Sequence, residues 1–292
     1  MENFTNYRFL NFKTEKNILL KDFLKEKGLT SRFIRKEINE KNIYLNYEPT
    51  FRNNRLKIGD VVSLKLQDEE LNGKVQFLDI EIIYEDDDLL IVNKPPFMPT
   101  HTSKGHSENT LLNYICGYFK RNNIKRKVRF INRLDNETSG IVLIAKNQFA
   151  HGIMELKLKN TIVKKYLALT EGVPYLNKGF IETYIKKSED GIKREISDKG
   201  DGKFAKTYYE LIKKGKNINL LSLRLYTGRT HQIRVHLSHI GCPILGDKLY
   251  NKTSNFINRQ ALHANYISFI HPRTNKRMEF SITLPKDMGD IV

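Results

Sequence analysis

The chain has few cysteines and no tryptophan. Only Cys116 and Cys242 occur among its 292 residues, and they lie far apart in the sequence. A disulfide framework needs several pairs of cysteines, and a thiolate metal site needs cysteines at short, regular spacing. The sequence therefore predicts neither, and both cysteines are expected to be free thiols in the protein interior.

Long apolar runs are also missing. A membrane-spanning helix needs a run of about 18 apolar residues, and the chain contains none. The N-terminal sequence MENFTNYRFL has no signal-peptide pattern. We expect a globular protein in the cytoplasm that does not bind membranes.

Acidic residues are scarce relative to basic ones. Asp and Glu total 33 against 50 for Lys and Arg, which gives a formal net charge of +17. Such an excess attracts polyanions by long-range electrostatic steering. RNA, DNA and an anionic membrane surface are the candidate partners, and the missing membrane signals favour a nucleic acid.

The first 70 residues predict a small helical unit. ILLKDFLKEKG (18–28) places its apolar residues on one helical face, and Thr30 or Ser31 can cap a second helix that runs to about Asn42. The second helix carries Arg32, Arg35 and Lys36 on one face. This face is either an RNA-contacting surface or ordinary solvated charge.

A domain boundary is expected in the acidic segment 68–79. Beyond it, IEIIYEDDDLLIVNKP alternates apolar runs with an acidic turn, which is typical of a β-hairpin. A larger α+β body is predicted from here to the C-terminus.

The segment YFKRNNIKRKVRF (118–130) is strongly basic. It holds six basic residues and no acidic one, interleaved with aromatic residues, and includes Lys125, Arg126 and Lys127. Basic side chains bind phosphates and aromatic rings stack on bases in single-stranded RNA. The segment is therefore a candidate RNA-binding strip, with a solvated helix end as the alternative.

One carboxylate, Asp135, follows Arg133 and Leu134 next to this strip in RLDNETSGIVLIAK. The apolar stretch from Ile141 to Ala145 predicts a buried strand, so the carboxylate is expected in a loop beside a rigid element. Taken alone, an Asp in such a turn is more often a turn former than a catalytic group.

A second polar segment, LRLYTGRTHQIRVHLSHIGCPILGDKLY (223–250), supplies a possible partner. Thr230 can cap a helix that Gly241 and Pro243 end, and this holds Arg229 at the helix entrance, where a guanidinium could reach a carboxylate or a phosphate. The histidines here do not share one helical face and have no accompanying ligand cluster, so no metal site is predicted.

These two segments together resemble the RluA-type family of RNA pseudouridine synthases, in which H-R-L-D-x-x-T-S-G is followed by T-G-R-T-H-Q-I-R-x-H. The resemblance covers about residues 80–285, and other matching stretches are VNKPPFMPTH (92–101), KKYLAL (164–169), AKTYYEL (205–211) and ALHA (261–264). One departure is Asn132, where the family has histidine. Residues 17–67, with two helices and short strands around a Gly59-Asp60 turn, resemble the S4 RNA-binding domain.

The resemblance implies a fold, an activity and residue roles. It implies an S4-like domain over residues 1–70 and an α+β catalytic domain over 75–292 with a mixed, largely antiparallel central sheet. Asp135 would be the catalytic carboxylate, with Arg229 as its ion-pair partner. Tyr166 would pack on the target uracil, and Arg133 would enter the gap left by the flipped nucleotide.

The expected reaction converts uridine to pseudouridine in RNA without a cofactor or metal. Glycoside hydrolysis usually employs two carboxylates because a water must be activated. In this isomerisation the departing base itself returns, so one carboxylate suffices. Large-subunit ribosomal RNA is the expected substrate, transfer RNA is the alternative, and the enzyme is expected to act as a monomer. A non-catalytic RNA-binding or ribosome-assembly protein and, less favoured, a uracil-removing glycosylase are the competing functions.

Overall fold

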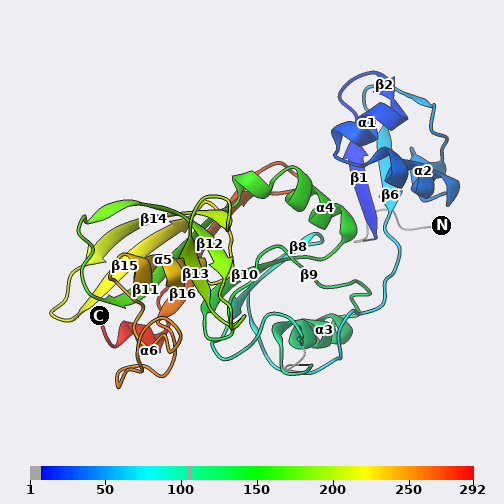
Figure 1. The fold of residues 1–292 in the computed structure, drawn as a ribbon. Helices are drawn as coiled ribbons and strands as arrows, with labels where there is room; N and C mark the ends of the chain where they lie inside the picture. The colour runs from blue at the N-terminus through cyan, green and yellow to red at the C-terminus, as the bar shows by residue number, and fades with distance from the viewer. Residues whose placement is uncertain (1–7, 104–106) are drawn as a thin grey trace.

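The computed structural model describes residues 8–103 and 107–292 (Figure 1). Its N-terminal unit joins two short helices to a small antiparallel sheet of order β1-β6-β3-β4 and a separate β2–β5 pair. The elements are β1 (Phe9–Lys13), β2 (Ile18–Leu19), α1 (Leu20–Glu26), α2 (Ser31–Asn39), β3 (Ile43–Leu45), β4 (Glu48–Pro49), β5 (Arg55–Leu56) and β6 (Val61–Lys65).

Both predicted N-terminal helices are present and bury the predicted faces. Leu20, Phe23 and Leu24 of α1 are buried in the core of the unit. The Thr30 hydroxyl accepts a hydrogen bond from Phe33 N at 3.3 Å and caps α2. This bond satisfies one of the amide groups that a helix start leaves without a partner.

The cations of α2 lie on its solvent side. Arg32, Arg35 and Lys36 are all exposed, and Lys36 lies 3.8 Å from Glu40. The helix therefore leaves this cationic face open to solvent.

The core of the N-terminal unit continues onto the larger body. Phe149 and Ile153, both on helix α4, belong to the same apolar cluster as Phe12 and Leu24. At Gly28, an added Cβ would lie 2.1 Å from Cδ1 of Ile153, so the backbone approaches α4 closely there. Shared apolar contacts thus join the two units (Figure 1).

Arg126 holds the segment between the two units. Its side chain is only 3% exposed, and Nη1 donates to Gln67 O at 2.7 Å while Nη2 donates to Leu66 O at 3.4 Å. Its guanidinium also approaches Asp68 to 3.4 Å. The predicted RNA contact of Arg126 is therefore wrong, because its guanidinium is buried and already donates to the backbone carbonyl oxygens of Leu66 and Gln67.

Within the described residues, the larger body forms one 11-stranded sheet with helices against its faces. The strands on its main path follow the order β13-β12-β14-β15-β11-β16-β10-β8-β7, with β17 paired to β16 and β9 to β10. The elements are β7 (Glu81–Glu85), β8 (Leu89–Lys94), α3 (Leu111–Arg121), β9 (Arg129–Phe130), β10 (Ser139–Ala145), α4 (Gln148–Leu156), the 3-10 helix η1 (Lys159–Thr161), β11 (Val163–Glu171), β12 (Lys178–Lys187), β13 (Arg194–Ser197), β14 (Lys203–Lys213), β15 (Ile218–Leu225), α5 (Gln232–His239), β16 (Leu262–Ile270), β17 (Arg277–Ser281) and α6 (Lys286–Gly289).

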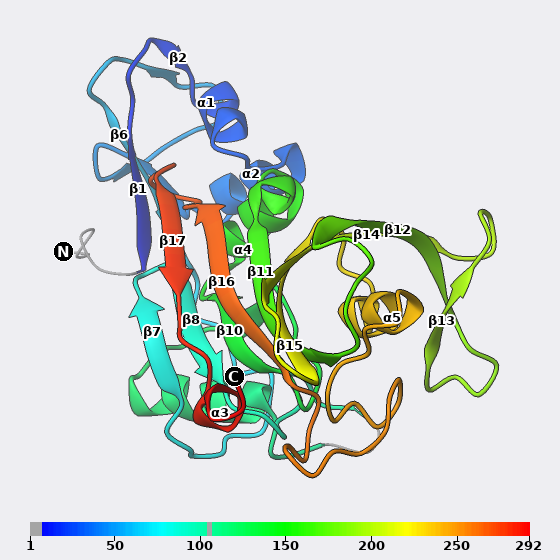
Figure 2. The same ribbon diagram turned by 90° about the vertical axis from the view of Figure 1, so that its left-hand side faces the viewer.

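The sheet is mixed and largely antiparallel, as predicted. Among the described strands, β10 and β16 form the one parallel pair. Figure 2 shows the half of the sheet that contains β12, β14, β15 and β11 curving around α5. None of the described helices is long and apolar enough to cross a membrane.

The central strands are apolar on both faces because both faces are covered. On β8, Leu90 and Val92 pack into the core that contains α3 and α5 residues, whereas Leu89 and Ile91 pack into the core that contains α4 residues. Successive side chains of a strand point to opposite faces. A continuous apolar run is therefore what a doubly covered strand needs.

Gly140 permits the close approach of β10 to β16. It has a φ of +118°, and an added Cβ would lie 2.3 Å from Ala264 O. The parallel pairing begins at this point, with Ser139 opposite His263 and Gly140 opposite Ala264. A residue with a side chain would separate the two strands, which explains the glycine in the TSG sequence.

We expect the fold to lose stability between pH 6.5 and pH 5. Burial lowers the pKa of both His236 and His263 from 6.5 to about 4. The unfolded chain then binds more protons than the folded one in this interval, so stability falls as the pH falls. Each unit of pKa shift corresponds to about 1.4 kcal/mol. As the pH approaches 4, the two histidines together would therefore lower the free energy of unfolding by roughly several kcal/mol.

Urea unfolding at pH 7.5, 6.0 and 5.0 measures this effect. The urea midpoint should fall steadily, and the His236→Gln variant should show a smaller fall than wild type. Equal wild-type midpoints at pH 7.5 and pH 5.0 would contradict the expectation.

Candidate active site

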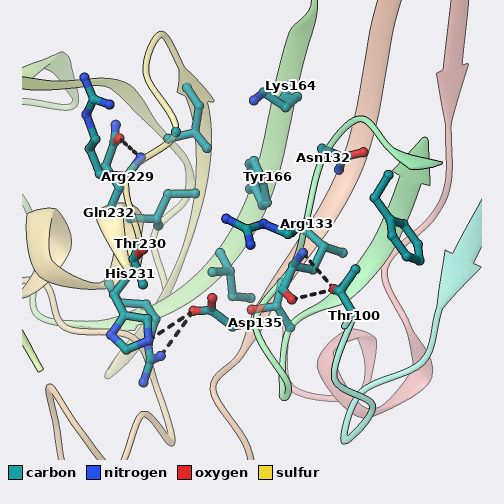
Figure 3. Close-up of a pocket in the computed structure, with 18 of the residues that line it drawn as sticks. Thr100, Asn132, Arg133, Asp135, Lys164, Tyr166, Arg229, Thr230, His231 and Gln232 are labelled. Carbon is teal, nitrogen blue, oxygen red and sulfur yellow. Dashed lines mark hydrogen bonds and ion pairs between the residues drawn. The ribbon is translucent and has the colours of Figure 1, made fainter. Parts of the chain in front are cut away.

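A cavity of about 790 Å³ surrounds Asp135 (Figure 3). Its wall comes from segments 99–101, 130–136 and 228–234, with Lys164 and Tyr166 of β11. We call it the Asp135 pocket. The two segments that the sequence singled out, far apart in the chain, thus face each other across one cavity.

Asp135 lies in the loop that leads into β10, with its side chain 33% exposed. Arg234 Nη1 donates to its Oδ2 at 3.2 Å, and His231 Nε2 lies 3.9 Å from the same oxygen. The adjacent guanidinium favours the ionised form of a carboxylate. The arrangement presents a charged, partly accessible oxygen to the pocket.

Arg234 bridges Asp135 to a buried carboxylate. Its Nε and Nη2 donate to Oδ2 and Oδ1 of Asp247, each at 2.7 Å, in a bidentate pair. Burial lowers the pKa of Arg234, but the bonds to the two carboxylates outweigh it and the net shift is upward. Because Asp247 fixes the guanidinium, Arg234 approaches Asp135 in one defined orientation.

The ion pair predicted for Arg229 is therefore made by Arg234. Arg229 does line the pocket, but its Nε donates to Phe204 O at 2.9 Å. The Gln232 side chain fixes this loop, since its Oε1 accepts hydrogen bonds from Arg229 N at 2.9 Å and the Thr227 hydroxyl at 2.8 Å. Arg229 thus stands at the pocket wall, on a loop that Gln232 holds.

The start of α5 also differs from the prediction. His231, with a φ of +55°, occupies the N-cap position in place of Thr230 and makes no side-chain capping bond. A left-handed conformation is unusual for a residue with a side chain. It aims the His231 ring at Asp135 (Figure 3).

His231 is neutral at pH 7 in this environment. Burial lowers its pKa below 6.5, against the opposing charge of Asp135. Its Nδ1 lies 3.0 Å from the Tyr250 hydroxyl, whose oxygen accepts a hydrogen bond from Arg194 N at 2.7 Å. The Tyr250 proton is then available to Nδ1, which places the imidazole hydrogen on Nε2, facing the carboxylate.

Lys94 and Thr100 hold the Asp135 loop from behind. The fully buried Lys94 Nζ donates to the carbonyl oxygens of Pro95, Met98 and Asn136 at 2.9, 2.7 and 3.1 Å. Burial lowers the pKa of Lys94 to about 7, opposed by the charge of Asp135. Three carbonyl acceptors match the three N–H groups of an ammonium. The Thr100 hydroxyl donates to Leu134 O at 2.8 Å.

Asn132 connects the same loop to β10. Its Nδ2 donates to Ile141 O at 3.1 Å, and its Oδ1 accepts from Leu143 N at 2.8 Å. The amide thus serves two backbone groups of the strand. Asn132, which stands where the RluA-type motif has histidine, therefore makes structural contacts to β10 in this chain.

The Asn132→Ala variant should be destabilised by about 1–3 kcal/mol, because it leaves Leu143 N and Ile141 O without these partners. Urea unfolding measures the loss. The matched control is Asn136→Ala, whose exposed side chain makes no hydrogen bond with the described residues and whose effect should stay within about 0.5 kcal/mol. Equal urea midpoints for the two variants would contradict the role of Asn132.

Arg133 and Tyr166 lie at the centre of the pocket. Arg133 is exposed, and Figure 3 shows its side chain extending across the cavity near Tyr166. Tyr166 is 5% exposed, and burial together with the Asp135 charge raises the pKa of its hydroxyl. Tyr166 is therefore a neutral phenol with its ring at the pocket wall.

The basic strip divides between surface and interior. Lys125 and Lys127 are exposed, and Lys125 lies 3.7 Å from Asp68. Phe130 lines the pocket, whereas Phe119 is fully buried in the core. The alternation of basic and aromatic residues in the sequence did not predict which of the aromatic rings would be buried.

A cluster outside the pocket has spacing suited to a metal ion. Ligand atoms of Asp86, Asp88 and His271 lie within 4.8 Å of one another, among the residues that the structure describes. Arg273 donates to both oxygens of Asp88 at 2.6 and 2.8 Å. Asp88 is therefore paired with a cation and Asp86 is bonded to His271 at 2.9 Å, and these contacts tie the β7–β8 turn to the turn after β16.

The chain is similar to known proteins over most of its length. Residues 88–239 match the family model described as RNA pseudouridylate synthase. The chain is 34% identical over 278 residues to the uncharacterized RNA pseudouridine synthase YjbO of Bacillus subtilis (strain 168), covering 94% of this chain and 98% of that protein. It is 38% identical over 232 residues to ribosomal large subunit pseudouridine synthase D of Zymomonas mobilis, covering 74% of this chain and 73% of the relative.

A solved structure shares the fold of the larger body. Human RNA pseudouridylate synthase domain containing 4 superposes with a TM-score of 0.59 at 25% identity, covering 72% of this chain and 90% of the human chain. The family match includes the Asp135 loop, Tyr166 and the Arg234 segment. The chain belongs to the RNA pseudouridine synthase family, isomerases that act on RNA.

Proposed function

We propose that this enzyme isomerises specific uridines in large-subunit ribosomal RNA, with Asp135 as its catalytic group. The observation that carries the proposal is the pocket carboxylate Asp135, which the buried Arg234–Asp247 pair orients. The ribosomal substrate rests on relatives named ribosomal large subunit pseudouridine synthases. Transfer RNA is the alternative substrate, and the same proposal places the enzyme in the cytoplasm.

The reaction breaks the bond between C1′ and N1 of uridine and forms one between C1′ and C5. Asp135 stabilises or captures the sugar carbon while the uracil turns. Once the new bond has formed, C5 loses its proton and N1 gains one, so the product is an isomer of uridine. Arg234 holds the carboxylate in place through its hydrogen bond to Oδ2. The base returns as the nucleophile, so the chemistry has no need for a second carboxylate that would activate water.

Tyr166 and Arg133 serve the target nucleotide. The buried Tyr166 ring forms part of the pocket wall and packs on the uracil. Arg133, already extended across the pocket (Figure 3), takes the place that the flipped base leaves in its stack. Extruding a base costs a few kcal/mol, which phosphate contacts across the basic protein surface offset.

The N-terminal unit serves as an S4-like RNA-binding domain in this proposal. Support comes from the exposed Arg32, Arg35 and Lys36 of α2. Lys125 and Lys127, also exposed, extend the cationic surface on the larger body. Phosphate contacts of this kind position RNA without reading its sequence.

Pseudouridine mapping of ribosomal and transfer RNA, from cells with and without the gene, tests the proposal. Loss of one or more large-subunit sites in the deletion, restored by the wild-type gene, is the expected result. Sites lost only from transfer RNA would overturn the substrate assignment. If the pseudouridine maps of all RNA are the same with and without the gene, the proposed catalytic role of Asp135 is overturned. A non-catalytic RNA-binding protein would then be favoured.

A further inference from the structure

A second cavity, of about 580 Å³, adjoins the Asp135 pocket. It lies between the end of β12, the start of β13, the start of β14 and the loop 228–230. We call it the hairpin pocket. Gly228, Arg229 and Thr230 line both cavities, so this loop is their common wall.

The hairpin pocket is strongly cationic. Five basic side chains and one carboxylate line it: Lys186, Lys187, Arg194, Lys203, Arg229 and Asp201. Lys186 Nζ is neutralised by Asp201 at 2.8 Å and Glu195 at 3.4 Å. The other four cations form no ion pair with any residue in 8–103 or 107–292.

Arg229 is suited to join the two cavities. Its Nε is held by Phe204 O at 2.9 Å, which leaves the N–H groups of Nη1 and Nη2 without a partner among the described residues. Its backbone N–H is fixed by Gln232. A guanidinium held at one nitrogen presents its remaining donors in a defined direction, as phosphate recognition needs.

Arg194 links the hairpin pocket to the catalytic group. Its backbone N–H donates to the Tyr250 hydroxyl, which contacts His231 next to Asp135. This hydrogen bond ties the backbone of β13 to the segment that carries His231. The strand that bears Arg194 is therefore placed close to the Asp135 pocket.

We propose that the hairpin pocket is a backbone subsite that binds the phosphodiester of an RNA nucleotide next to the target uridine, with Arg229 contacting the phosphate between them. The inference rests on the proposed function. A uridine in the Asp135 pocket carries a phosphate on each side, and its strand must leave the pocket across a wall. The 228–230 wall opens onto the unneutralised cations of the hairpin pocket.

Salt dependence of RNA binding tests the subsite without requiring turnover. The probe is a 20-nucleotide single-stranded RNA of mixed sequence, bound to the full chain over a series of salt concentrations. The triple variant Lys187→Gln/Arg194→Gln/Lys203→Gln should lower the slope of log affinity against log salt by about 0.7, the value for one lost phosphate contact. Its affinity near physiological salt should fall about tenfold or more.

A matched control removes the same charge elsewhere in the same sheet. Lys213, Lys214 and Lys216 are exposed around the β14–β15 turn, at the opposite end of β14 from Lys203. Their triple Gln variant should keep the wild-type slope. Equal slopes for the two triple variants would overturn the subsite, because the charge effect would then be general.

A second experiment locates the contact on the RNA. In the fragment where mapping finds the modified uridine, the phosphodiester on the far side of the neighbouring nucleotide is replaced by a neutral methylphosphonate, on the 5′ and the 3′ side of the target in turn. At one side only, the substitution should raise the wild-type KM about tenfold and leave the KM of the pocket variant unchanged. Additive losses at both sides would overturn the proposal. Absence of pseudouridine with wild-type enzyme on every RNA would instead overturn the proposed function.

Discussion

The Asp135→Asn enzyme should bind RNA as tightly as wild type and form pseudouridine at least about four orders of magnitude more slowly. Losses of this size follow removal of a group that acts directly on the reacting atom. Asparagine has the shape of aspartate, and its Oδ1 can still accept the hydrogen bond from Arg234. It lacks the charge that stabilises or captures C1′, so chemistry fails while the pocket persists.

Single-turnover kinetics with enzyme in excess, paired with equilibrium RNA binding, separates these effects. Asp290→Asn provides the control, because Asp290 is exposed near the C-terminus and contributes nothing to the pocket. Its rate should equal that of wild type. A substantial rate for Asp135→Asn would remove the carboxylate from the chemistry, and a lost RNA affinity would show that Asp135 serves binding.

The sequence indicated the two segments that wall the pocket because each is a continuous stretch that resembles a motif of the RluA-type family. The loop before β10, which carries Asp135, and the segment before α5 both line the cavity. The apolar run of β10 likewise predicted a buried strand, and the two apolar runs around the acidic turn predicted the hairpin of β7 and β8. Such patterns depend on a few neighbouring residues, which a sequence shows directly.

The identity of the arginine beside Asp135 could not be read in this way. Arg229 and Arg234 are five residues apart, and both are charged and near a helix start. The choice depends on the left-handed His231 and on the buried Asp247, which lies 13 residues beyond Arg234. Neither the conformation nor the distant carboxylate has a local sequence signal.

Arg126 illustrates the same limit for surface charge. Its neighbours Lys125 and Lys127 are exposed, yet Arg126 is buried because the chain at 66–68 returns to offer carbonyl acceptors. A run of basic residues indicates charge, but not which members find an internal partner. Only the path of the linker decides that.

Arg234 carries the prediction that best separates it from Arg229. In Arg234→Met, Asp247 becomes a fully buried carboxylate without its bidentate partner. Removing one member of a buried pair costs about 3–5 kcal/mol, so this variant should be strongly destabilised as well as inactive. Loss of activity alone would then be ambiguous, and a conservative variant is needed.

Arg234→Lys resolves the ambiguity because it keeps a positive charge beside both carboxylates but cannot pair bidentately with Asp247. We expect a folded enzyme with turnover reduced by about two to three orders of magnitude, as for loss of an oriented electrostatic group. Arg229→Ala should keep the wild-type single-turnover rate at saturating enzyme and lose RNA affinity, since Arg229 does not contact Asp135. If Arg229→Ala instead loses this rate while Arg234→Lys keeps it, Arg229 is the residue that orients Asp135 during turnover.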